Sequence, residues 1–396
     1  MSHRESTLPY WRLSGFYFIW AAVIGVLMPY WSLYLQHLGY DARSIGLLMA
    51  TLAATQVMAP FLWGYLADRC GRRAGLIRAG LWLALLCFGG VFIDGGGAWL
   101  ALVMFGFGCF WNAMAPQLEA LTLGHLRHQP GRYSQIRLWG SIGFIASVLL
   151  LGALLDRTGP ALLPAFVAAS LTLTLLASYS VGDPVDDVPP KPALPLLAVL
   201  KQPTVLIFFA TGLLMHASHG PYNTFYSLYL REHEYSSLSI GLLWSLGTFA
   251  EVGVFLLMHR CLARFTLSTL LLFSLLAAAV RWCLIGAFPD QLAVLIVAQC
   301  LHAATFGSFH AAAIESIRRH FQPSLAGQGQ ALYYSVCIGA GTCLGAIYSG
   351  LLWPLVGAFG TFLVASLLAL TGAWLYRPRR PADSTDACAG GAFEQH

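Results

Sequence analysis

The sequence predicts an all-α membrane protein whose twelve transmembrane helices form two pseudo-symmetric six-helix bundles. Of its 396 residues, 58% are hydrophobic and only 10% are charged, whereas soluble domains average about 25% charged residues. The apolar residues gather in twelve runs, each near the ~20 residues that a helix needs to cross a bilayer. The two halves of the chain also repeat one another. This composition argues against a soluble enzyme, a nucleic-acid-binding protein and a disordered chain.

The twelve runs follow one another with short polar connections. Their apolar residues are continuous, whereas the strands of a membrane barrel alternate over about ten residues. The first run is too long for the core of a signal peptide and lacks a small-residue cleavage site, so we expect it to be retained. In chain order the runs cover 13–35, 44–66, 75–93, 97–120, 136–155, 160–180, 204–230, 238–258, 266–288, 291–314, 328–352 and 357–376.

The basic residues predict the orientation. The side that carries both termini holds 17 of the 22 Lys and Arg residues, and the other side holds only Arg43, Arg157 and Arg231. Because cytoplasmic loops are enriched in Lys and Arg, we expect both termini to be cytoplasmic. The net charge of +5 then reflects topology, and we expect a multi-pass protein of the bacterial inner membrane.

The repeat is clearest where SLYLQHLGYDARSIGLL (32–48) matches SLYLREHEYSSLSIGLL (227–243) at a constant offset. Each segment ends one helix, crosses a loop and begins the next, so the two halves have the same orientation. Between them lies the Pro-rich, charged stretch DPVDDVPPKPALP, which is typical of a linker. The predicted divisions are a first six-helix half (1–181), a cytoplasmic linker (182–203), a second six-helix half (204–378) and a disordered cytoplasmic tail (379–396).

The connection between the second and third runs reads GYLADRCGRR (64–73). It resembles the loop signature of the major facilitator superfamily, G-x-L-a-D-r-x-G-r-r, whose members pair two parallel six-helix halves around a midplane substrate site. The resemblance implies a conformational latch, and the alternative is that the positive loop reflects topology alone. The latch would comprise Gly64, Asp68, Arg69, Gly71, Arg72 and Arg73.

Ionisable residues inside the apolar runs are costly, so each is a candidate functional residue. Glu119, Arg137, Glu251, Arg281 and His302 occupy the places of Glu, Arg, Glu, Arg and His on helices 4, 5, 8, 9 and 10 of the lactose permease branch, which they resemble. Within that branch the likeness is greatest to the phenylpropionate permease group, carried by stretches such as RLWGS, LLWSLG, VRW and LHAATF. The alternative to a functional role is that Glu119 with Arg137, or Glu251 with Arg281, forms an ion pair that only stabilises the structure. His216 and His310 are expected to be hydrogen-bonded core residues. For His219 and His302, which the resemblance also reaches, a functional and a structural role are both open.

One departure from the family concerns the proton carrier. Lactose permease has a proton-carrying Glu three residues after the His of helix 10, where this chain has Thr305, which cannot titrate. Burial favours the uncharged form of a carboxyl group, so Glu251, the deepest carboxylate, is the expected carrier. Its repeat partner is Gln56, so only one half carries the acid. Glu315 is the second candidate, although Arg318 or Arg319 would pair with it.

These residues predict a secondary active transporter that takes up a small organic solute with protons. For an aromatic carboxylate such as 3-phenylpropionate, Arg137 would bind the carboxylate, with Trp139, Tyr222 and Phe225 as ring contacts. For a sugar, oligosaccharide or nucleoside, Glu119 and Arg137 would share hydroxyl groups. The resemblance favours the aromatic acid.

Other classes of protein fit less well. A drug/proton antiporter usually has a Pro- and Gly-rich motif in helix 5, and 140–156 contains no Pro. A non-transporting sensor or scaffold has no need of charges deep in the membrane. The nine Cys residues form no CxxC pair and predict neither disulfides nor a metal site. We expect no enzyme activity and no cofactor, a proton as the coupling ion, a small-molecule substrate and the lipid bilayer as partners, no nucleic acid, and a monomer.

Overall fold

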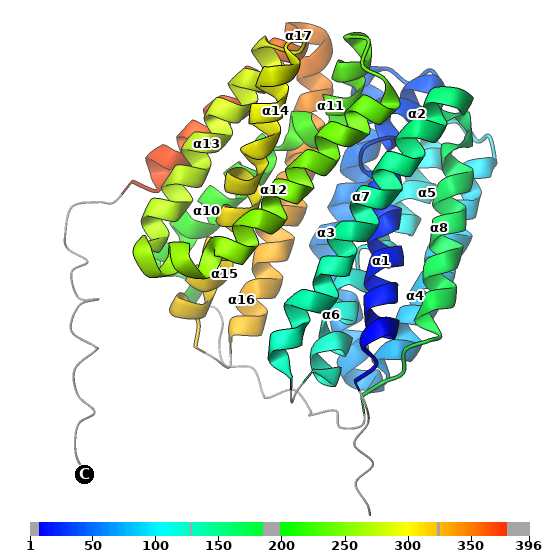
Figure 1. Cartoon of the computed structure of the whole chain (residues 1–396), viewed down its shortest axis with the longest axis vertical. Helices are drawn as coiled ribbons and strands as arrows, with labels where there is room; N and C mark the ends of the chain where they lie inside the picture. Colours follow the sequence, from blue (N-terminus) through cyan, green and yellow to red (C-terminus); the bar gives the residue numbers. More distant parts are fainter. Residues whose placement is uncertain (1–7, 127–128, 185–198, 323–324, 378–396) are drawn as a thin grey trace, which may run out of the picture.

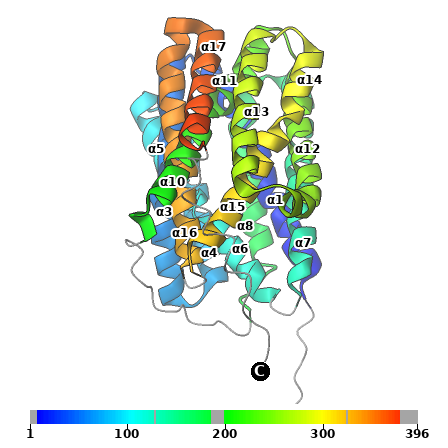
Figure 2. The same ribbon diagram turned by 90° about the vertical axis from the view of Figure 1, so that its left-hand side faces the viewer.

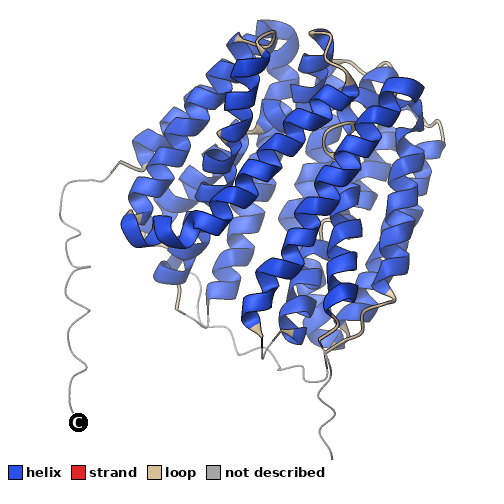
Figure 3. Ribbon diagram, viewed as in Figure 1, coloured by secondary structure: helices blue, strands red, loops and turns tan. Residues whose placement is uncertain are grey.

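The computed structural model of the chain describes residues 8–126, 129–184, 199–322 and 325–377, and every regular element in these ranges is a helix (Figure 3). The predicted tail (379–396) and most of the predicted linker (182–203) lie outside the described residues. The helices run along a common axis (Figures 1 and 2). We call the end of the bundle where α1 begins the lower end, as in Figure 1, and the opposite end the upper end.

Two of the predicted runs in the first half of the chain are broken rods. The first breaks at 28–30, and the fourth breaks at 112–113. The elements of this half are α1 (Tyr10–Leu27), α2 (Trp31–His37), α3 (Ala42–Cys70), α4 (Arg73–Gly89), a 3-10 turn (Gly90–Phe92), α5 (Gly96–Trp111), α6 (Met114–His125), a second 3-10 turn (Pro130–Arg132), α7 (Tyr133–Thr158), a third (Pro160–Leu162) and α8 (Leu163–Ser178).

The second half has the same order of long helices, with breaks in three of them. Two of the breaks are π-helical segments, which are often found at functional sites. The elements are α10 (Pro203–Ser218), α11 (Gly220–Glu232), α12 (Ser237–Arg264), α13 (Leu267–Ala287), α14 (Leu292–Cys300), the π segment η4 (Ala303–Ser308), α15 (Phe309–His320), α16 (Ala326–Leu332), the π segment η5 (Tyr333–Ala340) and α17 (Gly341–Leu375).

In the described residues, ten helical segments are long and apolar enough to cross a membrane. The predicted runs 328–352 and 357–376 fall in one of these, Gly327–Leu375, whose 49 residues would extend about 74 Å if straight. The chain turns inside it at Gly357, where φ is 70° and ψ −177°, a combination essentially restricted to glycine. The predicted run 204–230 is divided at His219 into α10 and α11 and is not among the ten.

The sequence repeat reappears in the way two helices begin. Asp41 accepts a hydrogen bond from Ser44 N at 2.9 Å and caps α3. Its repeat partner Ser236 accepts from Ser239 N at 3.1 Å and caps α12. Side-chain oxygens of this kind satisfy the free N–H groups of a helix start. Hydrogen bonds from Ser44 also hold the pKa of the Asp41 carboxyl below its ordinary value.

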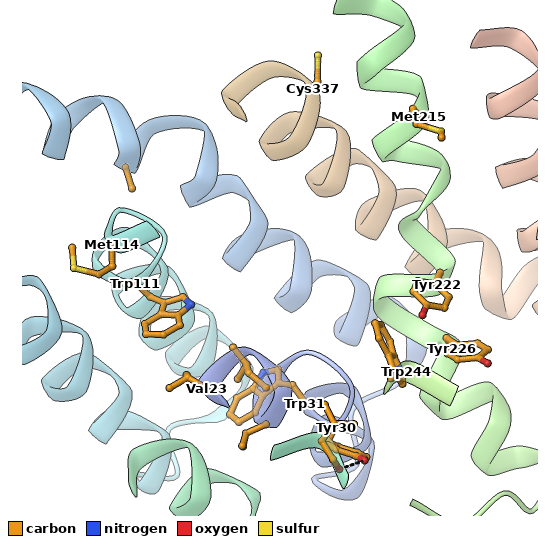
Figure 4. Packing of buried hydrophobic residues seen from close by; sticks show 14 of the residues in the cluster. Val23, Tyr30, Trp31, Trp111, Met114, Met215, Tyr222, Tyr226, Trp244 and Cys337 are labelled. Carbon is orange, nitrogen blue, oxygen red and sulfur yellow. Dashed lines mark hydrogen bonds between the residues drawn. The ribbon is translucent and has the colours of Figure 1, made fainter. Parts of the chain in front are cut away.

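Buried aromatic rings pack on one another in both halves of the chain. In the first half Trp31 packs on Phe88, with ring centroids 5.7 Å apart. In the second half Tyr222 packs on Trp244 at 4.6 Å, and Tyr226 lies beside both (Figure 4).

The two halves meet closely at the upper end through glycines that the repeat relates. A Cβ atom on Gly46 of α3 would lie 2.5 Å from Cα of Gly350 in α17. One on its repeat partner Gly241, in α12, would lie 2.6 Å from the hydroxyl oxygen of Tyr30, and the same hydroxyl donates to Ser237 O at 3.1 Å. Of the hydrogen bonds that join the halves in the described residues, all but one, from the Ser335 hydroxyl to Val57 O, lie at this end.

Candidate functional site

Arg281 of α13 is fully buried and makes four polar contacts with the broken helix α14–η4–α15. Its guanidinium donates to Ala298 O at 2.9 Å, His302 Nδ1 at 3.1 Å, Thr305 Oγ1 at 3.1 Å and Gln299 Oε1 at 3.3 Å. No carboxylate of the described residues lies within ion-pair distance of it. A buried cation that lacks a paired anion depends on such hydrogen bonds.

Aromatic faces complete the surroundings of the guanidinium. Its carbon lies 4.3 Å from the ring centroid of Tyr222 and 4.7 Å from that of Trp282, positions in which ring electrons attract a cation. The Tyr222 hydroxyl donates to Gln299 Oε1 at 3.0 Å. Oε1 of Gln299 therefore accepts hydrogen bonds from both Tyr222 and Arg281, so the amide is oriented with its oxygen toward these two donors.

His302 lies between Arg281 and Glu251. Because a guanidinium only donates hydrogen bonds, Nδ1 of His302 must accept, and a proton on the neutral ring must sit on Nε2. This nitrogen lies 3.5 Å from Glu251 Oε2. Glu251 and Arg281 therefore do not form the direct ion pair that was the structural alternative for them, because His302 lies between the two groups. The side chains of Glu251 and His302 keep 19% and 15% of their surface accessible, so neither group is fully enclosed by protein.

A π segment and a glycine produce this arrangement. The π segment η4 begins directly after His302 and shifts the register of the residues that follow. A Cβ on Gly247 of α12 would lie 3.2 Å from Gln299 Oε1 and 3.4 Å from His302 Cδ2, tighter than ordinary contact, so this glycine permits α12 to approach. Thr305, at the position of the family's proton-carrying Glu, serves as an acceptor for Arg281.

The second pair, Glu119 of α6 and Arg137 of α7, is linked through a tyrosine. The Tyr133 hydroxyl donates to Glu119 Oε1 at 2.7 Å and accepts from Arg137 Nη1 at 2.9 Å, while the two charged groups lie 3.7 Å apart. The Arg137 side chain is 53% exposed and that of Glu119 29%. Arg137 uses one nitrogen for its hydrogen bond to Tyr133, so its half-exposed guanidinium keeps donors that can bind another molecule.

Four further residues of the predicted substrate and proton pathway, Trp139, Tyr222, Phe225 and His219, pack on aromatic rings. Trp139 donates to the Tyr10 hydroxyl at 3.4 Å and packs on Trp11; residues two apart on a helix do not share a face, so Trp139 points away from Arg137. The other three, Tyr222, Phe225 and His219, are buried in the core of the second half. They pack there on Trp244, Trp353 and Trp282 respectively.

Glu315 is the last of the predicted pathway residues. It accepts from Arg318 Nε at 2.8 Å and from Arg319 Nε at 3.0 Å near the lower end of α15. All three residues are on one helix, at spacings of three and four, so the interaction is local.

The signature loop turns sharply, as its glycine predicts. Gly71 has φ 62° and ψ 9°, and its N–H returns to Ala67 O at 3.0 Å to end α3, a common helix-ending geometry. The guanidinium of Arg69 lies over the Tyr65 ring. Arg73 donates to Gln117 Oε1 at 2.9 Å, and Arg72 stands directly before α4.

Two members of the predicted latch need separate mention. An added Cβ on Gly64 would meet nothing within 4 Å, so no described residue packs closely against this glycine. The side chain of Asp68 lies outside the described part of the structure.

Sequence reasoning missed several residues that the structure brings to the site. Gln299 stands in an apolar run where an amide is as unusual as a charge. Tyr133 precedes Arg137 by four residues, which places both on one helix face.

Comparison with known proteins identifies relatives over almost the whole chain. The model of the MFS_1 like family matches residues 10–364. A probable 3-phenylpropionic acid transporter of Escherichia coli K12 is 32% identical, covering 93% of this chain and 97% of the relative. A maltose permease of Geobacillus stearothermophilus is 29% identical, covering 90% and 91%. Among solved structures, a mutant of the nucleoside transporter NupG superposes with a TM-score of 0.82 at 16% identity, covering 93% and 98%.

Proposed function

We propose that this chain, which belongs to the MFS_1 like family, couples proton entry to the uptake of an aromatic carboxylate such as 3-phenylpropionate. Membership of the family makes it a membrane transporter and not an enzyme. The relative that is 32% identical is described as a probable transporter of that compound. The observation that carries the proposal is Arg137, a half-exposed guanidinium that keeps donors beyond its hydrogen bond to Tyr133. A guanidinium binds a carboxylate with two parallel hydrogen bonds.

The membrane arrangement that we propose has twelve crossings in two six-helix halves joined by the linker at 182–203. The turn at Gly357 divides the last long element into two passes, and α10 with α11 supplies one more. The distribution of Lys and Arg supports cytoplasmic termini, so the lower end faces the cytoplasm of a bacterial inner membrane. Close contact at the upper end then corresponds to a state that is shut toward the outside, in a transporter that functions as a monomer.

Glu251 is the proposed proton carrier, and His302 its partner. Oε2 of Glu251 lies 3.5 Å from Nε2 of His302, a contact that favours the charged carboxylate and that protonation would weaken. Protonation therefore changes the bonding of a chain that extends through His302 to Arg281 and the aromatic core of the second half. Because Glu251 is joined in this way to a packed core, its protonation can favour one arrangement of the two halves over another.

A sugar or nucleoside is the second candidate substrate. Glu119 supports it, because its partly exposed carboxylate beside Tyr133 and Arg137 can accept hydrogen bonds from hydroxyl groups. A maltose permease and a xanthosine permease are among the relatives.

Uptake by vesicles tests the proposal. The purified protein in liposomes receives radiolabelled 3-phenylpropionate or a radiolabelled disaccharide, with and without an inward proton gradient. We expect accumulation of 3-phenylpropionate only with the gradient. If only the disaccharide accumulates with the gradient, the substrate is a sugar and not the aromatic acid. If accumulation is the same with and without the gradient, uptake is not coupled to protons.

A further inference from the structure

Below the upper end, the two halves touch again where α3 faces the π segment η5. The Ser335 hydroxyl of η5 donates to Val57 O of α3 at 2.8 Å. A Cβ atom on Gly339, further along η5, would lie 3.0 Å from the carbonyl carbon of Gln56 and 3.0 Å from the amide nitrogen of Val57. The absence of a side chain at Gly339 therefore lets the two helices meet backbone to backbone at this level.

Both helices depart from regular α-helical hydrogen bonding at this contact. Pro60 lies inside α3. Proline has no N–H, so the carbonyl of the residue four positions earlier, here Gln56, lacks its usual donor. On the other side η5 is a π segment, in which each N–H bonds one residue further back than in an α-helix. Because Gly339 packs against Gln56, the two breaks face each other across the boundary between the halves.

The contact divides each of the two helices into an upper and a lower part. Above it, α3 and α17 are held together where Gly46 lies against Gly350, and about 16 Å of helix separates Gly46 from Val57. Below it, an added Cβ at Gly64 would meet nothing within 4 Å. The lower part of α3 leads to the signature loop, and α16 continues η5 downward. The close contacts made at glycines along α3 thus end at the level of the two breaks.

We propose that Pro60 and η5 together form a hinge, about which the lower part of α3 and α16 bend toward each other while Gly46 and Gly350 stay in contact. Helices bend sharply at prolines and at π segments, and here one contact joins a bend of each kind. Bending at this level closes the lower end before the upper end opens, so the transporter passes through a state that is shut at both ends. The hinge goes beyond the proposed function and does not depend on which solute is carried.

Distances within the first half distinguish this hinge from two halves that rock as rigid bodies. In a rigid half, the lower part of α3 keeps a fixed distance from α8, whereas a hinge makes that distance vary. Three exposed leucines provide sites for spin labels in a background without the native cysteines: Leu66 in the lower part of α3, Leu47 in its upper part and Leu176 in α8. The pair Leu47 with Leu176 is the matched control, because neither residue lies below the hinge.

Double electron–electron resonance in lipid nanodiscs, without any substrate, gives the distance distribution of each labelled pair. We expect the distribution for Leu66 with Leu176 to be broader than that for Leu47 with Leu176. We expect Pro60→Ala to narrow it to the width of the control, because alanine restores an N–H that can donate to Gln56 O. Equal widths for the two pairs without this substitution, or a Pro60→Ala distribution that stays broad, would overturn the hinge.

The same substitution shows whether transport needs the bend. Bending must break the restored hydrogen bond, which slows the step by up to about tenfold. We expect Pro60→Ala to lower the rate of 3-phenylpropionate uptake by about this factor, although its melting temperature rises because proline destabilises a helix interior. Pro203→Ala is the control and should keep wild-type uptake, since Pro203 is the first residue of α10, where no helical hydrogen bond needs its N–H.

The outcomes of the two measurements separate the hinge from the proposed function. Wild-type uptake by Pro60→Ala would overturn the hinge as a step of transport, even where the distances show that α3 bends. If the protein without substitutions takes up no 3-phenylpropionate, the proposed substrate is wrong, and the distance distributions alone decide whether the hinge exists.

Discussion

Asp156, at the upper end of α7, caps a helix of the opposite half. Its Oδ1 accepts from Ser237 N at 2.6 Å, and its Oδ2 accepts from Leu238 N at 3.0 Å. These are the first N–H groups of α12, where the helix dipole favours a negative charge. Arg231 adds an ion pair at 3.9 Å. Opening the upper end must break this cap, so Asp156 should stabilise the closed state.

The perturbation is Asp156→Asn, which removes the charge and one of two acceptors. Hydrogen bonds to charged groups contribute about 1.5–3 kcal/mol, and because the Asp156 side chain is 26% exposed we take the lower value. About 1.5 kcal/mol corresponds to roughly a tenfold larger population open at the upper end. Asp41→Asn is the matched control, since Asp41 caps α3 within its own half and Asn is an equally good cap.

The assay reads the open population through a buried thiol. Val148 is fully buried beneath this contact, and its carbonyl accepts from Tyr30. In a background without the native cysteines, Val148→Cys should react with a membrane-impermeant maleimide only when the upper end opens. We expect Asp156→Asn to speed labelling about tenfold and Asp41→Asn to leave it unchanged. Equal rates in all three proteins would refute the role of this cap.

Three further predictions follow from the same structure. Combining Glu119→Arg with Arg137→Glu should leave transport abolished in a normally inserted protein, because a carboxylate clamp needs its cation in one place; recovered uptake would make the pair structural. Asp68→Asn should slow uptake strongly while 3-phenylpropionate still binds, and wild-type uptake rates would leave topology as the reason for the signature. Gly357→Ala should destabilise the protein by about 1–3 kcal/mol, measured as a lower melting temperature, whereas Gly64→Ala, at an uncrowded position, should melt like wild type.

Local sequence patterns predicted the long helices because hydropathy depends on the residues of each segment alone. Hydropathy located the long helices, and the constant offset related the two helix starts that the structure caps with Asp41 and Ser236. Breaks inside the helices were harder to foresee. The π segment after His302 changes which residues share a face, and the turn at Gly357 lies inside one continuous helical segment.

The candidate site was predictable in its charges but not in their partners. Burial cost singles out Arg281 and Glu251 from sequence alone, yet nothing in the sequence says that His302 lies between them or that Tyr133 lies between Glu119 and Arg137. Those bridges depend on how neighbouring helices are rotated. Trp139 illustrates the point, because two positions along α7 from Arg137 it packs on Tyr10 and Trp11.

The most direct test of proton-coupled uptake is proton movement driven by the substrate. Liposomes that contain the protein and an internal pH-sensitive dye receive external 3-phenylpropionate, and protein-free liposomes measure passive entry of the acid. We predict internal acidification well above the protein-free rate for wild type, and at the protein-free rate for Glu251→Gln. Acidification by Glu251→Gln at the wild-type rate, or wild-type uptake of labelled substrate without any extra acidification, would contradict a transporter coupled through Glu251.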